Sequence, residues 1–232
     1  MPEMIRLKSA IDGFEFDAWH GKTDGVRKGG LVLIQEIFGL DHYILEDAKR
    51  WVAQGYEVIV PSMFDRQERG FVADHDADGI ATGLKYSREN GTENPVSDVQ
   101  ACVDALRQDG PVFLIGYCYG GTVGWRAAAA IDALSAVVSY YGGGVAAIAD
   151  MEPKCPVIFN FGRKDPNIPA DDVMATIKAA HPAVPVHIYE NSGHGFNNDG
   201  RPDSNLEDAR LARARASALF DACGAVMPGK RP

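Results

Sequence analysis

Short continuous apolar runs alternate with amphipathic segments along most of this chain, and this alternation restricts the folds that the chain can adopt. Six apolar runs indicate strands buried on both faces: 31–35, 57–60, 111–115, 136–140, 157–161 and 186–190. Apolar residues recur at helical spacing in five segments: 42–54, 97–108, 122–131, 170–180 and 206–222. Because strands and helices alternate along the chain, each helix is expected to connect two parallel strands by crossing over one face of the sheet. We therefore predict an α/β fold with a mainly parallel sheet and helices on both faces.

Two segments depart from this rhythm. The opening pair, 5–8 and 14–19, is typical of an antiparallel hairpin at one edge of the sheet. The stretch 65–94 is long, charged and rich in glycine, with room for a short helix. Long excursions inside a compact domain are often binding loops, so we interpret it as a flap or substrate loop; a solvated insertion is the alternative. A chain of 232 residues with 46% hydrophobic composition favours one domain, 1–232.

Charge and composition exclude several classes of partner. A formal net charge of −9 repels nucleic-acid phosphates and anionic lipid headgroups, so we expect neither as a partner. No apolar run has the length of a signal peptide or a membrane span, which predicts a cytoplasmic protein. Cys102, Cys155 and Cys223 are interpreted as small buried hydrophobes. No cysteine or histidine pair has metal-ligand spacing, so we expect no metal and no cofactor.

The fourth cysteine, Cys118, lies in a segment with a specific shape. Residues 112–121 are a buried strand that runs into G-x-C-x-G and then into a helix. A nucleophile on a sharp strand-to-helix turn needs very small neighbours two residues away on each side, and Gly116 and Gly120 satisfy this. The turn would hold the sulfur beside the positive end of the following helix, which favours a thiolate. A structural cysteine in a nucleotide-binding turn is the weaker alternative, because G-K-[ST] and a complete G-x-G-x-x-G are both missing.

An acid and a histidine follow in the order that such a nucleophile requires. Asp165 comes just after the strand at 157–161, and His194 comes just after the strand at 186–190. Alone, such an aspartate is more often a loop cap and such a histidine a surface residue. The ordered triple instead favours a catalytic site in which Asp165 orients His194. Cys118 would attack a carbonyl carbon while the backbone N–H groups of Ile37 and Tyr119 hold the oxyanion.

With these motifs the chain resembles the dienelactone hydrolase (carboxymethylenebutenolidase) family of α/β-hydrolases over nearly its full length. The likeness is strongest in Q-E-I-F-G at 35–39, Q-G-Y at 54–56, G-Y-C-Y-G-G at 116–121, Y-Y-G at 140–142 and G-H-G-F at 193–196. The resemblance implies a Cys118–His194–Asp165 triad. It also implies that Glu36 lies near the cysteine and takes the thiol proton when substrate binds. Without the family, Glu36 is simply a loop carboxylate beside the site.

The resemblance implies an enzyme that hydrolyses a small-molecule ester or lactone, as a monomer or small homo-oligomer. Family members hold a substrate carboxylate with two arginines, one in the excursion and one four residues after the histidine; here the second position is Asn198. Candidate substrate contacts are therefore Arg66, Arg69, Arg88, Phe38 and Asn198, with Lys85 and Arg163 as further cations. Two other functions stay open: acyl transfer to a thiol or amine, and noncatalytic binding of a small ligand.

Overall fold

An eight-stranded sheet forms the centre of the molecule, and we describe it from a computed structural model covering residues 2–199, 201–202 and 204–224. The strand order is β1-β2-β4-β3-β5-β6-β7-β8. The strands are β1 Glu3–Lys8, β2 Glu15–Gly21, β3 Gly29–Ile34, β4 Tyr56–Pro61, β5 Val112–Tyr117, β6 Leu134–Tyr140, β7 Val157–Gly162 and β8 Val186–Tyr189. From β4 to β8 in this order, each strand pairs in parallel with the next. At the other edge, β2 pairs antiparallel with both β1 and β4. The predicted antiparallel edge is confirmed.

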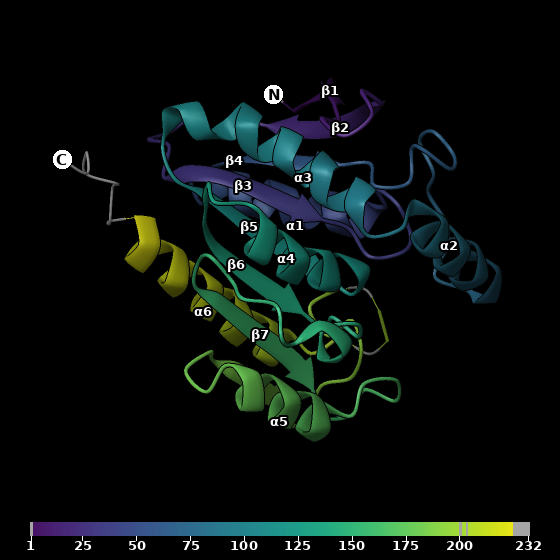
Figure 1. The fold of residues 1–232 in the computed structure, drawn as a ribbon, viewed down its shortest axis with the longest axis vertical. Helices are drawn as coiled ribbons and strands as arrows, with labels where there is room; N and C mark the ends of the chain where they lie inside the picture. Colours follow the sequence, from purple (N-terminus) through teal and green to yellow (C-terminus); the bar gives the residue numbers. More distant parts are fainter. Residues whose placement is uncertain (1, 200, 203, 225–232) are drawn as a thin grey trace.

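Helices cover both faces of this sheet, as the alternation predicts. Helices α3 (Glu93–Leu106) and α4 (Tyr119–Ala130) lie in front of the sheet in Figure 1, and α1 (His42–Ala53) and α6 (Leu206–Gly224) lie behind it. Helix α5 (Ala170–Ala180) lies beyond β7 near one end of the sheet. The predicted α/β-hydrolase architecture is therefore the observed one. Within the described residues, no helix is both long and apolar enough to cross a membrane.

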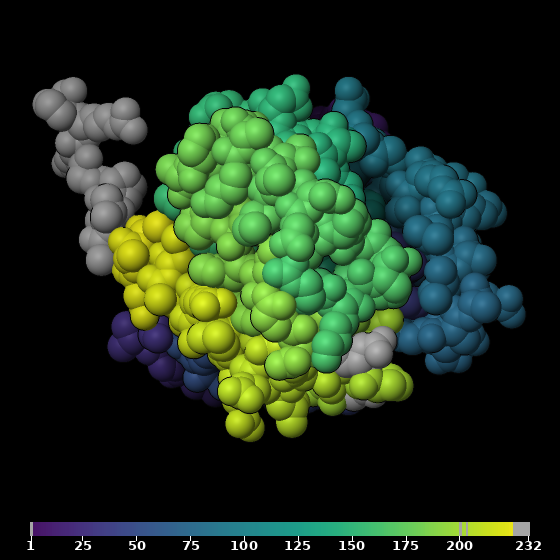
Figure 2. All heavy atoms as spheres, turned by 90° about the horizontal axis from the view of Figure 1, so that it is seen from below, coloured from purple at the N-terminus to yellow at the C-terminus, as the bar shows by residue number. Residues whose placement is uncertain are grey.

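The excursion at 65–94 contains more helix than its sequence suggests. Helix α2 spans Ala77–Asn90, and α3 follows almost directly, beginning four residues before the predicted start. Figure 2 shows α2 projecting from one side of the molecule, on the side away from α6. Upstream of α2, the chain forms a single antiparallel bridge between Val72 and Gly39. The excursion is thus joined to the loop that follows β3.

The carboxyl ends of the parallel strands bring the candidate residues to one edge of the sheet. Glu36 follows β3, Cys118 follows β5, Asp165 follows β7 and His194 follows β8. Strand β3 pairs directly with β5, and β7 pairs directly with β8. In open α/β sheets, ligands bind in the crevice outside the carboxyl ends of the strands. The topology therefore places four chemically active side chains where a ligand site is expected.

Candidate active site

The turn at Cys118 has the backbone conformation of a strained elbow. Cys118 has φ 52° and ψ −110°, a region that side-chain-bearing residues rarely occupy. A Cβ on Gly116 would lie 1.9 Å from the carbonyl oxygen of Gly120, and one on Gly120 would lie 2.6 Å from that of Ile34. Only glycine fits at either position. The Cys118 N–H donates to Tyr140 O at 3.0 Å, which anchors the turn to β6.

His194 hydrogen-bonds to both other members of the predicted triad. Its Nδ1 donates to Asp165 Oδ2 at 2.7 Å, and the Cys118 side chain is its other hydrogen-bond partner. Burial by itself lowers the pKa of His194, but the hydrogen bonds to Asp165 and Cys118 outweigh it and raise the pKa to about 10. Asp165 is buried, and its other oxygen accepts the N–H groups of Asn167 and Ile168. The carboxylate is therefore held rigidly toward the imidazole.

A charged pair, Glu36 and Arg201, lies beside the triad. Glu36 is buried, and its Oε2 accepts a hydrogen bond from Arg201 Nη1 at 3.3 Å. Burial raises the pKa of Glu36 above its ordinary value, although the positive charges of Arg201 and His194 oppose this rise. The interaction with His194 also places Glu36 within electrostatic reach of the triad. Glu36 is thus a carboxylate near the nucleophile with an unusually high affinity for a proton.

Tyr141 lies at the meeting point of these groups. Its ring centroid lies 5.0 Å from that of His194. Burial, followed by electrostatic interactions with Glu36 and Cys118, raises the pKa of Tyr141 well above its ordinary value. Tyr141 also has a positive φ of 37°, and its N–H donates to Asn160 O at 2.8 Å. The phenol therefore stays neutral and packs against the imidazole.

The two predicted oxyanion donors come from the loop after β3 and from the start of α4. Tyr119 is the first residue of α4, and the first N–H groups of a helix have no partner within the helix. The next N–H, that of Gly120, donates to Gln35 O at 3.2 Å, which holds the Glu36–Ile37 loop against the helix start. The backbone N–H groups of Ile37 and Tyr119 thus belong to two segments that are hydrogen-bonded together beside Cys118.

The excursion packs closely on this same loop. The Ala73 N–H donates to Phe38 O at 3.0 Å, and the His75 ring stacks on Phe38 with centroids 3.8 Å apart. His75 also hydrogen-bonds through Nε2 to Asp41 at 2.6 Å. A Cβ on Gly83 of α2 would lie 2.1 Å from Ile37 O. The position of the Ile37 backbone therefore depends on contacts from residues 73–83.

Comparison with known proteins agrees with this arrangement. The model of the dienelactone hydrolase family matches residues 16–224. A carboxymethylenebutenolidase from Pseudomonas putida is 30% identical over 93% of this chain and 94% of its own length. A crystal structure of a Klebsiella pneumoniae protein assigned as a dienelactone hydrolase superposes with TM-score 0.82 at 25% identity, covering 95% of this chain and 99% of that one. The chain belongs to the dienelactone hydrolase family.

This dienelactone hydrolase family member is accordingly a hydrolase, and its site contains one arginine that the sequence analysis missed. Arg201 lies seven residues after His194, three positions beyond Asn198. Its guanidinium carbon lies 5.9 Å from the centroid of the Phe38 ring and its Nη1 contacts Glu36. Phe38 is thus stacked on His75 and also lies close to Arg201. No periodicity or spacing marks Arg201 in the sequence, since the loop that carries it lies outside any strand or helix.

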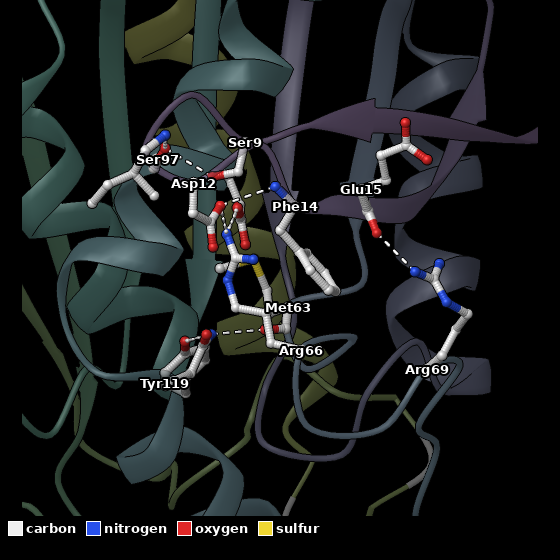
Figure 3. Close-up of polar contacts among 12 residues, drawn as sticks. Ser9, Asp12, Phe14, Glu15, Met63, Arg66, Arg69, Ser97 and Tyr119 are labelled. Carbon is white, nitrogen blue, oxygen red and sulfur yellow. Dashed lines mark hydrogen bonds and ion pairs between the residues drawn. The ribbon is translucent and has the colours of Figure 1, made fainter.

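The structure does not bring the arginines of the excursion to this site. Figure 3 shows Arg66 pointing toward Asp12 and Phe14, while Arg69 extends to the carbonyl oxygen of Glu15. The Arg66 guanidinium pairs with buried Asp98 at 2.8 Å and lies 4.4 Å from the Phe14 ring centroid. Both arginines therefore attach the excursion to the β1–β2 hairpin and α3. Arg66 and Arg69, which we expected at the substrate, instead form ion pairs within the fold.

Of the remaining candidate substrate contacts, only Asn198 lies close to Glu36. Arg88 is exposed near the end of α2, and Lys85 is exposed with Glu89 Oε1 3.8 Å from its Nζ. Arg163 forms ion pairs with Glu190 and Asp171. Asn198 is buried and lines a narrow cavity of about 20 Å³ together with Glu36. Asn198 therefore belongs to the surroundings of Glu36.

Proposed function

We propose that this protein hydrolyses small esters or lactones through an acyl-thioester formed on Cys118. The observation that carries the proposal is the double hydrogen bonding of His194, to Asp165 and to Cys118, at a strained elbow. Such an arrangement of nucleophile, base and orienting carboxylate supports acyl transfer on many unrelated folds.

In the acylation step, Glu36 takes the proton of the Cys118 thiol. The sulfur then bonds to the carbonyl carbon, and the carbonyl electron pair moves to the oxygen, which the N–H groups of Ile37 and Tyr119 stabilise. When the oxyanion collapses, the carbon–oxygen ester bond breaks and the leaving alkoxide takes a proton from His194. The raised pKa of His194 suits this role, because the imidazole carries a proton at neutral pH.

In the deacylation step, neutral His194 takes a proton from water, and the hydroxide attacks the thioester carbonyl. The carbon–sulfur bond breaks, which releases the acid product and leaves the Cys118 thiolate beside a protonated His194. Glu36 then returns its proton to the sulfur, which restores the thiol and the ionised carboxylate. Asp165 stabilises the imidazolium in this step through its 2.7 Å hydrogen bond. The same histidine thus acts first as an acid and then as a base.

The position of Arg201 favours a substrate that carries a carboxylate. Its guanidinium contacts one carboxylate, Glu36, and a substrate anion that bound Arg201 would compete for that contact. Glu36 would then be released toward the thiol at the moment when substrate is bound. The related proteins named carboxymethylenebutenolidase favour the same class of ligand. Arg201 would supply the cation that Asn198 lacks.

Steady-state kinetics test this function. Matched carboxylated and neutral esters are compared with the unmodified protein, Cys118→Ala and Arg201→Met. The proposal expects Cys118→Ala to lose turnover of both esters while keeping the folded circular dichroism spectrum. It expects Arg201→Met to lose the preference for the carboxylated ester. Turnover that survives in folded Cys118→Ala would overturn the proposal.

A further inference from the structure

Gln35 is the first residue of the Q-E-I-F-G motif, and the mechanism above gives its side chain no role. This side chain is fully buried, with 0% of the residue exposed. Its Nε2 donates to Glu36 O at 3.2 Å, and its Oε1 accepts the Met63 N–H at 3.1 Å. One backbone partner needs a donor and the other needs an acceptor, so only one orientation of the amide satisfies both. Backbone groups therefore hold the Gln35 amide at both ends.

The hydrogen bond to Glu36 O also sets the direction of the Ile37 N–H. The Glu36 C=O and the Ile37 N–H belong to one peptide group, which is planar and trans. In a trans peptide group, the C=O and the N–H point in opposite directions. Holding the oxygen on the side of Gln35 therefore directs the N–H to the other side. No backbone carbonyl among the described residues accepts a hydrogen bond from this N–H, which leaves it available to a ligand oxygen.

The main chain of Gln35 connects the same loop to the start of α4. Its carbonyl oxygen accepts the Gly120 N–H at 3.2 Å. Tyr119, which carries the other proposed oxyanion donor, directly precedes Gly120. The side chain of Gln35 thus holds the peptide group that contains the Ile37 N–H, and its backbone holds the segment that contains Tyr119. The relative position of the two donors therefore depends on the contacts of one residue.

A second buried amide, that of Asn90 at the end of α2, holds Met63 in turn. Its Nδ2 donates to Met63 O at 2.7 Å and to Tyr119 OH at 3.2 Å. Asn90 is only 1% exposed. Figure 3 shows the Tyr119 side chain near the Met63 carbonyl group. A continuous hydrogen-bond network therefore runs from the oxyanion loop through Gln35, Met63 and Asn90 to Tyr119.

We propose that Gln35 is a positioning residue that directs the Ile37 N–H toward the oxyanion formed on the substrate carbonyl. This inference rests on the proposed function. Because its side chain is fully buried, Gln35 acts through the Glu36–Ile37 peptide group and not on the substrate. Donors that are already oriented stabilise a transition state well, since they need not turn as the negative charge develops. Without the Gln35 amide, the Ile37 N–H loses the contact that fixes its direction.

Two reactions of Cys118 distinguish this role from a purely structural one. Acylation by an ester places negative charge on the carbonyl oxygen, and the oxyanion donors stabilise that charge. Alkylation by iodoacetamide forms a bond from sulfur to a CH₂ carbon and releases iodide, so no oxyanion is formed. Loss of the direction of the Ile37 N–H slows acylation alone. Distortion of the whole elbow slows both reactions.

The test measures both rates in Gln35→Met, which keeps a side chain of similar size and removes both amide hydrogen bonds. With enzyme in excess over a chromogenic ester, the rate of Cys118 acylation should fall about 10²-fold, the size of one lost oxyanion donor. The rate of iodoacetamide alkylation should stay within about twofold of the unmodified rate. A trifluoromethyl ketone, which bonds to the sulfur and forms an oxyanion without being hydrolysed, should bind more weakly by a factor similar to the loss in acylation.

Two further variants keep the test decisive. Asn90→Ala removes the donor to Met63 O, so it should lower the ratio of acylation to alkylation by about threefold or more, even where Gln35→Met fails to fold. Ser9→Ala is the matched control. It removes a hydrogen bond of 2.8 Å between the buried Ser9 hydroxyl and Ser97 Oγ, outside this network, and should leave the ratio unchanged.

The outcomes separate this inference from the function on which it rests. An unchanged ratio in folded Gln35→Met or in Asn90→Ala would overturn the positioning role. Equal losses of acylation and alkylation would also overturn it, since they indicate a structural role. If the unmodified protein hydrolyses ester without acylating Cys118, the proposed function itself fails.

Discussion

Arg201 Nη1 donates to Glu36 Oε2 at 3.3 Å, which joins two residues 165 positions apart in the sequence beside the Cys118 elbow. This contact neutralises a buried carboxylate, and a buried carboxylate without a partner is costly. In the proposed mechanism, Glu36 must leave this contact to act as a base, and Arg201 binds the substrate anion. The proposal therefore links substrate selection and nucleophile activation through one pair of side chains.

The first prediction concerns selectivity. Arg201→Met should reduce kcat/KM for a carboxylated ester, relative to a neutral ester of the same shape, by about tenfold to a hundredfold, the size of one lost charge-assisted contact. Using the ratio cancels any general effect on Glu36. Arg201→Lys, which keeps the charge but loses the planar fork, should retain part of the preference. An unchanged ratio in Arg201→Met would show that Arg201 does not contact the substrate anion.

The second prediction concerns Glu36 as the proton acceptor. Glu36 must be ionised to take the thiol proton, so kcat/KM should fall as pH drops through its raised pKa, at a pH above the ordinary value of 4.5. Glu36→Gln should lower kcat/KM by about 10²-fold or more and abolish this acidic limb, because the amide cannot accept the proton. A pH profile of kcat/KM measures both effects. The same acidic limb in Glu36→Gln would assign it to another group.

The third prediction concerns stability at alkaline pH. The pKa of His194 rises from 6.5 to about 10 on folding, so its contribution to stability is fully present below about pH 6.5 and is lost as pH rises through 10. Asp165→Asn removes the carboxylate that helps to raise this pKa. Its free energy of unfolding should therefore fall less between pH 7 and pH 10 than that of the unmodified protein. Urea unfolding at both pH values gives the comparison, and equal slopes would contradict it.

The fourth prediction tests the contact between α2 and the oxyanion loop. A Cβ at Gly83 would lie 2.1 Å from Ile37 O, so Gly83→Ala must displace that loop. We expect kcat to fall by about 10²-fold, in line with the loss of one oxyanion donor. Alkylation of Cys118 by iodoacetamide should continue at its unmodified rate. Thr82→Ala on the same helix is the matched control and should leave kcat unchanged.

Much of this fold could be predicted because its strands are continuous apolar runs between amphipathic helices. The elbow could also be predicted, since backbone crowding demands glycine at positions 116 and 120. Helix α2 was underestimated because Gly79 and Gly83 interrupt its helical pattern, and Gly83 is glycine for a tertiary reason, the proximity of Ile37. The local sequence around Gly83 does not indicate that contact.

The arginines show the limit of sequence reasoning more clearly. Arg66 and Arg69 were attractive substrate ligands because they lie in the excursion, yet they pair with Asp98 and Asp17 instead. Arg201, which does lie at the site, contacts Glu36, which is 165 positions away in the sequence. Which cation reaches a site is decided by three-dimensional pairing, and neither spacing nor composition encodes that pairing.

Detection of the covalent intermediate is the most direct test of the central claim, that Cys118 carries the acyl group. Asp165→Asn is mixed with an acetyl ester, quenched in acid and digested, and the peptides are analysed by mass spectrometry. This variant should deacylate slowly, because weakening of the triad costs on the order of 10³- to 10⁴-fold in rate. The account predicts one acetyl group on the peptide that contains Cys118, removable by hydroxylamine. An acetyl group on any other residue, or hydrolysis with no acetylated peptide at any quench time, would contradict it.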